Sequence, residues 1–325
     1  MALLYAGIDE AGYGPMLGPL CVGLSVFRVE GWTEGEPSPD LWQTLSGGVC
    51  RTLTEARGTK LIPIADSKKL KLSNQVKTKH PLVHLERGVL AFNGARSGDL
   101  PASDDGLFER LGAAPAAEAW YGEPASLPVG TTEGELRLDV ASLRKTLATA
   151  GVELVHLGVR WVGESDFNRI VRETGTKAEA TLGAVGAHLR DVVDEIEQDT
   201  LRVVCDRLGG RTKCGPLVAR ELPGIPVSLV RENPELGEYA LGDGGQLGRI
   251  AFMPEAEEKH LPVALASMAA KLVRELAMAR FNRYWSARVP ELKPTAGYVQ
   301  DAKRWLGEVG ESITADERRR LVRLA

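Results

Sequence analysis

Apolar residues form short runs along the chain, and several of these runs stop at an acidic residue. Residues 3–8 are apolar and end at Asp9 and Glu10, and residues 20–29 form a second apolar run. The segment between them is rich in glycine and proline, which predicts a tight loop joining two antiparallel strands. Two carboxylates are therefore expected at the end of a buried strand, beside a glycine-rich backbone.

Alternating apolar and polar residues predict a strand at residues 152–162. A further apolar segment predicts a strand at residues 200–206, which ends in Asp206. A β-hairpin is expected within residues 239–252. Spacings of three and four between apolar residues predict helices, and the long one near the C-terminus carries small residues that permit close packing. Helices are predicted at residues 41–45, 138–150, 164–173, 176–198 and 261–284, and from residue 314 onward.

The composition narrows the function classes. Lys and Arg total 40 against 44 Asp and Glu, which gives a net charge of −4, so bulk charge cannot bind a polyanion. Nucleic acid would have to meet a local basic face or metal ions. Four scattered cysteines without a CxxC pair indicate neither a disulfide framework nor a zinc site. The start lacks a signal segment and no run reaches membrane length, so a soluble cytoplasmic protein is expected.

Three segments carry candidate chemistry, and each also has an ordinary structural interpretation. Asp9 and Glu10 suit a hard divalent cation, but acids are common at strand ends. Ser67 and Lys68 follow Asp66 where a helix begins, so they suit a phosphate or simply a capped basic helix. Glu275 lies one helical turn after Lys271, as in a surface ion pair.

The string DEAGYGPMLGPL at residues 9–20 resembles the signature of the type 2 ribonuclease H family, with Tyr13 where the family has Arg. The string DSKKL at residues 66–70 is similar to the family's second motif. Residues 266–275 resemble its third motif, with Glu275 in place of Asp as in the ribonuclease HIII branch. Gly297 and Tyr298 resemble its C-terminal element, although the usual Thr and His are missing downstream.

This resemblance implies an α/β fold of the ribonuclease H-like type, with a mixed, mostly five-stranded sheet between helices. We expect one domain spanning residues 1–325, with insertions at about 30–60, 80–150 and 207–260. The first strand starts so early that no N-terminal domain of the ribonuclease HIII type is expected before it.

The resemblance also implies the chemistry: hydrolysis of RNA in RNA/DNA hybrids or of ribonucleotides in duplex DNA, giving 3′-hydroxyl and 5′-phosphate ends. Asp9, Glu10, Asp206 and Glu275 are expected to be the catalytic and metal-binding residues. They would hold two Mg²⁺ or Mn²⁺ ions roughly 4 Å apart. Four clustered carboxylates need such cations to offset their repulsion.

The expected substrate contacts follow from the same motifs. The family reads the 2′-hydroxyl with its glycine loop and C-terminal Tyr, which implies Gly12, Gly14 and Tyr298 here. Tyr13 loses a cation that could hold phosphate but gains a ring that can stack on a sugar or base. Ser67 and Lys68 would lie near the substrate backbone. The expected partner is nucleic acid, with no membrane and no obligate protein partner, so the protein should be a monomer.

Two alternatives remain open on the sequence. Tyr13 and the insertions allow a metal-dependent nuclease of shifted specificity, acting on structured or double-stranded RNA. The departures at Tyr13 and Glu275 and the missing C-terminal Thr and His allow a non-catalytic nucleic-acid-binding protein on the same fold. Four retained carboxylates speak against the second alternative, because a binder gains nothing from concentrated negative charge.

Overall fold

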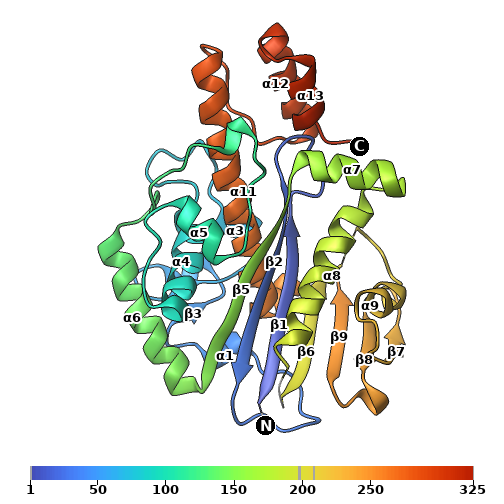
Figure 1. The fold of residues 1–325 in the computed structure, drawn as a ribbon. Helices are drawn as coiled ribbons and strands as arrows, with labels where there is room; N and C mark the ends of the chain where they lie inside the picture. The colour runs from blue at the N-terminus through green and yellow to red at the C-terminus, as the bar shows by residue number, and fades with distance from the viewer. Residues whose placement is uncertain (1, 197–198, 208, 325) are drawn as a thin grey trace.

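The computed structural model describes residues 2–196, 199–207 and 209–324 of the chain. Its centre is a seven-stranded mixed sheet in the order β5-β2-β1-β6-β9-β8-β7 (Figure 1). Separately, β3 (Val49–Cys50) and β4 (Ile62–Pro63) form a short parallel pair. The strands of the main sheet are β1 (Leu3–Ala11), β2 (Leu20–Val29), β5 (Val152–Val162), β6 (Thr200–Asp206), β7 (Val227–Glu232), β8 (Gly237–Leu241) and β9 (Gly248–Met253).

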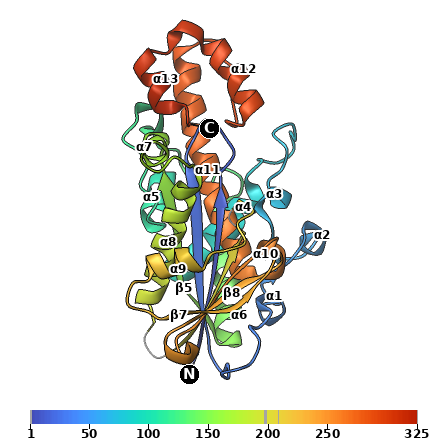
Figure 2. The same ribbon diagram turned by 90° about the vertical axis from the view of Figure 1, so that its right-hand side faces the viewer.

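Helices cover both faces of this sheet (Figure 2). No helix in the described part of the chain is long and apolar enough to cross a lipid bilayer. The helices are α1 (Leu41–Thr44), α2 (Leu53–Ala56), α3 (Ser67–Leu70), α4 (Val83–Ser97), α5 (Asp104–Arg110), η1 (Ala119–Tyr121), α6 (Glu133–Ala150), α7 (Glu164–Thr174), α8 (Ala178–Asp194), α9 (Gly215–Glu221), η2 (Asp243–Gly245), α10 (Ala256–Lys259), α11 (Leu261–Arg288), α12 (Val299–Val309), η3 (Gly310–Ser312) and α13 (Ala315–Leu321).

The central strand β1 divides the core into two layers because successive side chains of a strand point to opposite faces. Leu3 and Tyr5 enter the core that α4 and α11 build on one face. Leu4, Ala6 and Ile8 enter the core that α8 and α9 build on the other face. Odd-numbered positions of β1 therefore face α11, and even-numbered positions face α8.

Helix α11 lies directly against β1 and β2. A Cβ atom on Gly7 would be 2.1 Å from the backbone nitrogen of Val263, and one on Gly23 would be 2.1 Å from the carbonyl oxygen of Ala266. Only glycine permits so close an approach. The close packing expected from the small residues is confirmed, and it brings Ser267 beside the end of β1.

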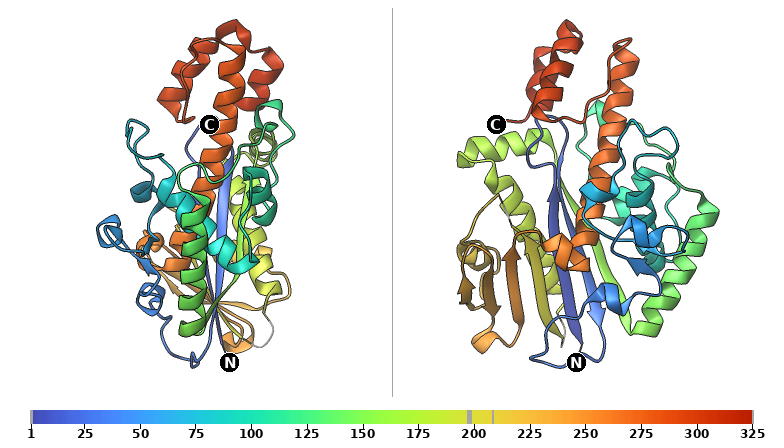
Figure 3. Two further views of the ribbon diagram at one scale, coloured as in Figure 1. Left: turned by 90° about the vertical axis from the view of Figure 1, so that its left-hand side faces the viewer. Right: turned by 180° about the vertical axis from the view of Figure 1, so that it is seen from behind.

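Past the end of the sheet, α11 joins α12 and α13 in a helical extension (Figure 3). Phe281 and Trp285 of α11 share a third hydrophobic core with Trp305 of α12. The chain then returns to the sheet, so its C-terminus lies beside the loop between β1 and β2 (Figure 1). The last residues are thereby placed next to the first sequence motif.

Most predicted elements are confirmed, with three differences. The sheet has seven strands instead of five, because the predicted hairpin of β8 and β9 and the further strand β7 extend it. Strand β1 continues to Ala11, so Asp9 and Glu10 lie within the strand and not after it. The bounds of two predicted helices differ, since α6 begins at Glu133 and α8 already ends at Asp194. Residues 197 and 198 of the second prediction and one turn position, Leu208, lie outside the described residues.

Candidate active site

Three predicted acids lie at one edge of the sheet. Asp9 and Glu10 are near the end of β1, and Asp206 is the last residue of β6. The two strands are parallel neighbours, and Ile8 of β1 pairs with Cys205 of β6, so Asp9 and Asp206 occupy adjacent positions. Parallel pairing therefore delivers carboxylates from two distant segments to the same place.

Asp9 and Glu10 point to opposite faces of the sheet, as the alternation along β1 requires. Asp9 faces α11, where a hydrogen bond from Ser267 favours its charged form. Glu10 faces α8, because it lines a cavity together with Thr181 and Leu182 of that helix. The Asp9 side chain also accepts a hydrogen bond from the Glu10 backbone N–H at 2.7 Å. The two neighbouring residues thus place one carboxyl group on each face of the sheet at this edge.

A fourth acid, Glu257, joins these three. It is the second residue of α10, directly after β9, which is parallel to β6. Its charge raises the pKa values of both Asp9 and Glu10. The sequence interpretation missed Glu257, although an apolar strand followed by acidic residues is the same signal that marked Asp9 and Asp206. Asp9, Glu10, Asp206 and Glu257 are called the acidic group below.

The pKa values of the acidic group are all raised. Burial is the largest cause at Asp9, whose pKa lies well above its ordinary range, and the charge of Glu10 adds to it. Burial and then the charge of Asp206 raise the pKa of Glu10 to about 7. Burial also raises the pKa values of Asp206 and Glu257. Burial therefore disfavours the charged form of each carboxyl group when no cation is bound.

Glu275, the predicted fourth ligand, is not part of the acidic group. Its carboxylate is 2.8 Å from the ammonium of Lys271 and 3.7 Å from that of Lys71. It lies eight residues beyond Ser267 on α11, which is about 12 Å along the helix axis at 1.5 Å per residue. The structure therefore supports the ion-pair interpretation of Glu275 and offers Glu257 for its predicted place.

The cationic neighbour of the acidic group is Lys68 of α3. Burial opposes its charge, but the negative charges of Asp66, Asp9 and Glu257 outweigh this and raise its pKa. Ser67, predicted to contact substrate, is buried, and its hydroxyl lies 3.0 Å from that of Ser267. Helix α3 is a single turn whose N-terminal amide donates to Asp66. Lys68 therefore faces the site, while Ser67 ties α3 to α11.

The loop of residues 12–19, called the glycine loop, is held from beneath by the buried side chain of Arg323. Its guanidinium donates to the carbonyl oxygens of Gly12 at 2.5 Å, Tyr13 at 2.9 Å and Gly18 at 3.4 Å. The Arg323 backbone N–H donates to Met16 at 2.8 Å. Burial lowers the pKa of Arg323 to about 10, so it stays charged at neutral pH.

A second buried arginine, Arg274 of α11, holds the other end of the glycine loop. It donates to the carbonyl oxygens of Pro19 at 2.6 Å and Leu17 at 3.1 Å. The carboxylate of Glu164 accepts from the backbone N–H of Gly18 at 3.1 Å. Neither arginine was predicted as a site residue, and for Arg323 no local sequence signal connects residues so far apart. Together these groups fix the backbone of the glycine loop.

The predicted substrate contacts on this loop occupy different environments. Gly12 has φ of 96°, and a Cβ atom there would lie 2.7 Å from the carbonyl oxygen of Pro19, so glycine is required. Gly14 is exposed, with nothing near its missing Cβ. Tyr298 is 49% exposed and precedes α12, next to Gly297, whose carbonyl accepts from the glycine loop. Gly14 and Tyr298 are therefore accessible to a ligand.

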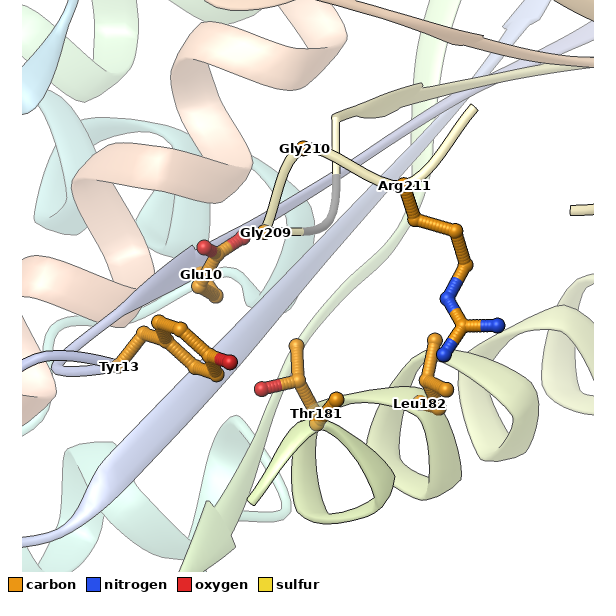
Figure 4. A pocket seen from close by; sticks show the side chains of 8 residues that line it. Glu10, Tyr13, Thr181, Leu182, Gly209, Gly210 and Arg211 are labelled. Atoms are coloured by element: carbon orange, nitrogen blue, oxygen red, sulfur yellow. The ribbon is translucent and has the colours of Figure 1, made fainter. Parts of the chain in front are cut away.

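A cavity of about 310 Å³ opens beside Glu10, on the α8 side of the sheet (Figure 4). Tyr13, Thr181, Gly209 and Arg211 form its walls, and Glu10 lies at its inner side (Figure 4). The cavity is called the Tyr13 cavity below. Its full lining is Glu10, Tyr13, Ala178, Thr181, Leu182, Gly209, Gly210 and Arg211.

The donor chemistry of the acidic group fits a hard divalent cation, which prefers carboxylate oxygens. Atoms Oε2 of Glu10 and Oε2 of Glu257 are buried and lack a hydrogen-bond partner in the described part of the chain. A cation would satisfy such oxygens and offset their charge. As the side chains stand, no three His, Cys, Asp or Glu residues within the described ranges are arranged to hold one ion. Binding therefore requires these carboxylates to draw together.

No protein-family model matches the chain, and no curated protein matches it. It is similar to the solved structure of ribonuclease HII with PCNA from Archaeoglobus fulgidus, at 15% identity and a TM-score of 0.42 over 99% of this chain and 94% of that chain. Ribonuclease H2 from Pyrococcus horikoshii OT3 gives 17% identity and a TM-score of 0.42 over 95% and 86%.

Bst ribonuclease HIII in complex with Mn²⁺ is also similar, at 15% identity and a TM-score of 0.40 over 99% of this chain and 66% of that chain. These values describe a likeness of fold to type 2 ribonucleases H at low identity. The chemistry of the site rests on this chain's own residues.

Proposed function

We propose that this protein is a metal-dependent endoribonuclease that hydrolyses RNA in RNA/DNA hybrids or ribonucleotides embedded in duplex DNA, leaving 3′-hydroxyl and 5′-phosphate ends. The acidic group carries the proposal, because four carboxyl groups with raised pKa values lie at one sheet edge, three on the parallel strands β1 and β6 and one on α10, which follows β9. Buried like charges destabilise a fold, so their retention favours a catalytic purpose.

Asp9, Glu10, Asp206 and Glu257 would hold Mg²⁺ or Mn²⁺. When bound, such ions activate a water molecule and stabilise the leaving oxygen of a phosphodiester. This reaction needs no covalent nucleophile from the protein. Glu257 takes the place first expected for Glu275, whose carboxylate is already neutralised by lysines.

The surrounding residues bind and orient the nucleic acid. Arg274 and Arg323 fix the carbonyl groups of the glycine loop beneath it, which keeps Gly14 accessible for a close approach of ribose or phosphate. Lys68 supplies a positive charge next to the acidic group for the phosphate backbone. Tyr298 is exposed beside the same loop and would contact the sugar. Discrimination of RNA from DNA is expected here, since only RNA presents a 2′-hydroxyl.

The direct test is cleavage of a labelled DNA duplex that contains one ribonucleotide, run beside an RNA/DNA hybrid and a duplex RNA. Each reaction is repeated with Mg²⁺, with Mn²⁺ and with EDTA. We expect cleavage of the first two substrates, dependent on metal. Removal of a metal-ligand charge in Asp9→Asn should lower kcat by at least about 100-fold, since such a charge contributes several kcal/mol to the transition state.

Asp316→Asn is the matched control, because Asp316 is an exposed acid on α13 far from the acidic group in sequence and pairs only with neighbouring arginines. Its activity should equal that of the wild type. Cleavage that survives EDTA, or that is equal in Asp9→Asn and the wild type, would contradict the proposal. If only duplex RNA were cleaved, the proposed metal-dependent hydrolysis would stand, but the proposed substrate would be wrong.

A further inference from the structure

The Tyr13 cavity has the features of a ligand site on the opposite side of the sheet from Ser267. Its volume of about 310 Å³ lies at the lower end of the range of about 300–1,000 Å³ that is usual for small-molecule sites. Glu10 of the acidic group lines it, so an occupant would lie next to the proposed reaction. The wall opposite the glycine loop is the first part of α8, formed by Ala178, Thr181 and Leu182.

Thr181 supplies an unused hydrogen-bonding group in this wall. Only 4% of the residue is exposed, and its hydroxyl has no hydrogen-bond partner within the described residues. In a helix, a buried threonine hydroxyl usually bonds to a backbone carbonyl one turn earlier. The Thr181 hydroxyl is instead directed toward the side of the cavity where Tyr13 lies (Figure 4). It is therefore available to a ligand.

The other walls provide an aromatic ring and one cation, and a second cation lies over that ring. The Tyr13 side chain forms one wall, and its hydroxyl end lies near Gly209 (Figure 4). The ammonium of Lys177 lies 5.1 Å from the centre of the Tyr13 ring. Arg211 is exposed at the far wall and forms no ion pair with any residue in the described part of the chain. An aromatic wall with an arginine on the same cavity suits a planar, negatively charged ligand.

We propose that the Tyr13 cavity binds one nucleotide of the substrate whose base is unpaired, with the base against Tyr13, a base or sugar polar group on the Thr181 hydroxyl and the phosphate at Arg211. This inference rests on the proposed nuclease function and narrows it to substrates with an unstacked nucleotide beside the cleaved bond. A cavity of about 310 Å³ has room for one nucleotide but not for a base pair. Proteins that read unpaired nucleotides commonly stack them on aromatic rings in this way.

The first measurement is the affinity for adenosine 5′-monophosphate and for uridine 5′-monophosphate, obtained from NMR chemical-shift changes during titration in the presence of EDTA. Inorganic phosphate is titrated as the comparison. Binding is expected for both nucleotides and much more weakly for phosphate. Thr181→Val keeps the shape and removes the hydroxyl, so it should weaken binding about fivefold. Arg211→Gln should weaken it about tenfold, because it removes a charge-assisted hydrogen bond.

Arg231→Gln is the matched control, since Arg231 is an exposed arginine on the edge strand β7 and lies outside the cavity. Its nucleotide affinity should equal that of the wild type. Arg211 is also exposed, so its substitution does not endanger folding. Equal affinity for nucleotides and inorganic phosphate, or no loss in Thr181→Val and Arg211→Gln, would overturn the proposal.

The second measurement compares cleavage of duplexes whose ribonucleotide faces either its complementary base or an abasic site. The unpaired form should have the lower KM in the wild type, and Arg211→Gln should reduce this difference. Metal-dependent cleavage with no nucleotide binding and no effect of pairing would overturn the cavity proposal and leave the nuclease proposal intact. Nucleotide binding without cleavage of any substrate would support the cavity and overturn the nuclease proposal.

Discussion

The guanidinium of Arg323 donates to the carbonyl oxygen of Gly12 at 2.5 Å, although the two residues are 311 positions apart in the chain. The end of the protein is thereby part of the structure that shapes its first sequence motif. Phe167 lies under the same guanidinium, whose central carbon is 4.0 Å from the ring centre. The segment that follows the helical extension seen in Figure 3 thus holds the backbone next to the acidic group.

Removing this contact should damage both the fold and substrate binding. Arg323→Met leaves the buried carbonyl oxygens of Gly12 and Tyr13 without their donor, which should lower the free energy of unfolding by about 2–4 kcal/mol. Arg323→Lys keeps the positive charge but lacks the several N–H donors of the guanidinium. Its free energy of unfolding should therefore lie between those of Arg323→Met and the wild type. Urea unfolding and the KM for a ribonucleotide-containing duplex measure the two effects.

Arg318→Met serves as the control for Arg323, because Arg318 is an exposed arginine on α13 that contacts no part of the glycine loop. It should change the free energy of unfolding by less than about 0.5 kcal/mol. If Arg323→Met matched this control in both stability and KM, the Arg323 contacts would have no role in shaping the loop.

Substitutions of Glu257 and of Glu275 should have different effects on cleavage, because Glu257 belongs to the acidic group and Glu275 lies in an ion pair. Glu257→Gln removes a carboxylate of the acidic group and should lower metal-dependent cleavage by at least about 100-fold. Glu275→Gln removes only a pairing with Lys71 and Lys271, so cleavage should fall by less than about fivefold. Steady-state kinetics at saturating Mn²⁺ separates them. If Glu275→Gln lost much more activity than Glu257→Gln, Glu275 would be the fourth metal ligand and Glu257 would not.

The half-buried His156 of β5 should make stability fall on acidification. Burial is the main cause that lowers its pKa to about 4; the charges of His188, Arg96 and Arg160 act in the same direction, and Asp191 opposes them. The unfolded chain takes up this proton near the usual pKa of about 6.5. The neutral side chain therefore contributes fully above pH 6.5, and its contribution is lost as the pH falls from about 6.5 to about 4.

The size of this pH effect can be isolated with His156→Gln. A depression of this size corresponds to about 3 kcal/mol between pH 7.5 and pH 4, and the variant should lack that part of the pH dependence. The acidic group contributes in the opposite direction, since its raised pKa values make protonation favourable in the folded state. The difference in urea unfolding between wild type and variant removes that shared term. Parallel pH profiles would show that His156 titrates normally in the folded protein.

The close contact between α11 and the sheet predicts that one added methyl group on β2 will strongly lower the stability of the protein. In Gly23→Ala the new Cβ would lie 2.1 Å from the carbonyl oxygen of Ala266, so α11 must shift and stability should fall by more than about 3 kcal/mol. Gly14→Ala adds the same group where no atom lies within 4 Å, and should change stability by less than about 0.5 kcal/mol. Thermal unfolding of both variants tests this difference directly.

Local sequence patterns were sufficient for the main strands and for where their acids lie. The strands predicted at residues 20–29, 152–162 and 200–206 agree with β2, β5 and β6, because each segment is either mostly apolar or alternates apolar and polar residues. The prediction was wrong at the end of β1, because it ended the strand before the first charged residue, Asp9, whereas β1 continues to Ala11. A strand can carry polar residues where it leaves the core, so Asp9 and Glu10 remain in the ladder and point to opposite faces.

The sequence by itself determined the main strands, the position of Asp9 and Asp206 near the ends of two of them and the glycine loop, since these follow from hydrophobic patterns and turn chemistry within a few residues; the α/β class followed from the family resemblance. Only the tertiary structure revealed Glu257 as a candidate ligand, because parallel strand pairing brings it to the acidic group, whereas Glu275 lies farther along α11 in an ion pair with Lys271. It also decided the role of Arg323, since no local pattern records which distant carbonyl groups a buried guanidinium will reach.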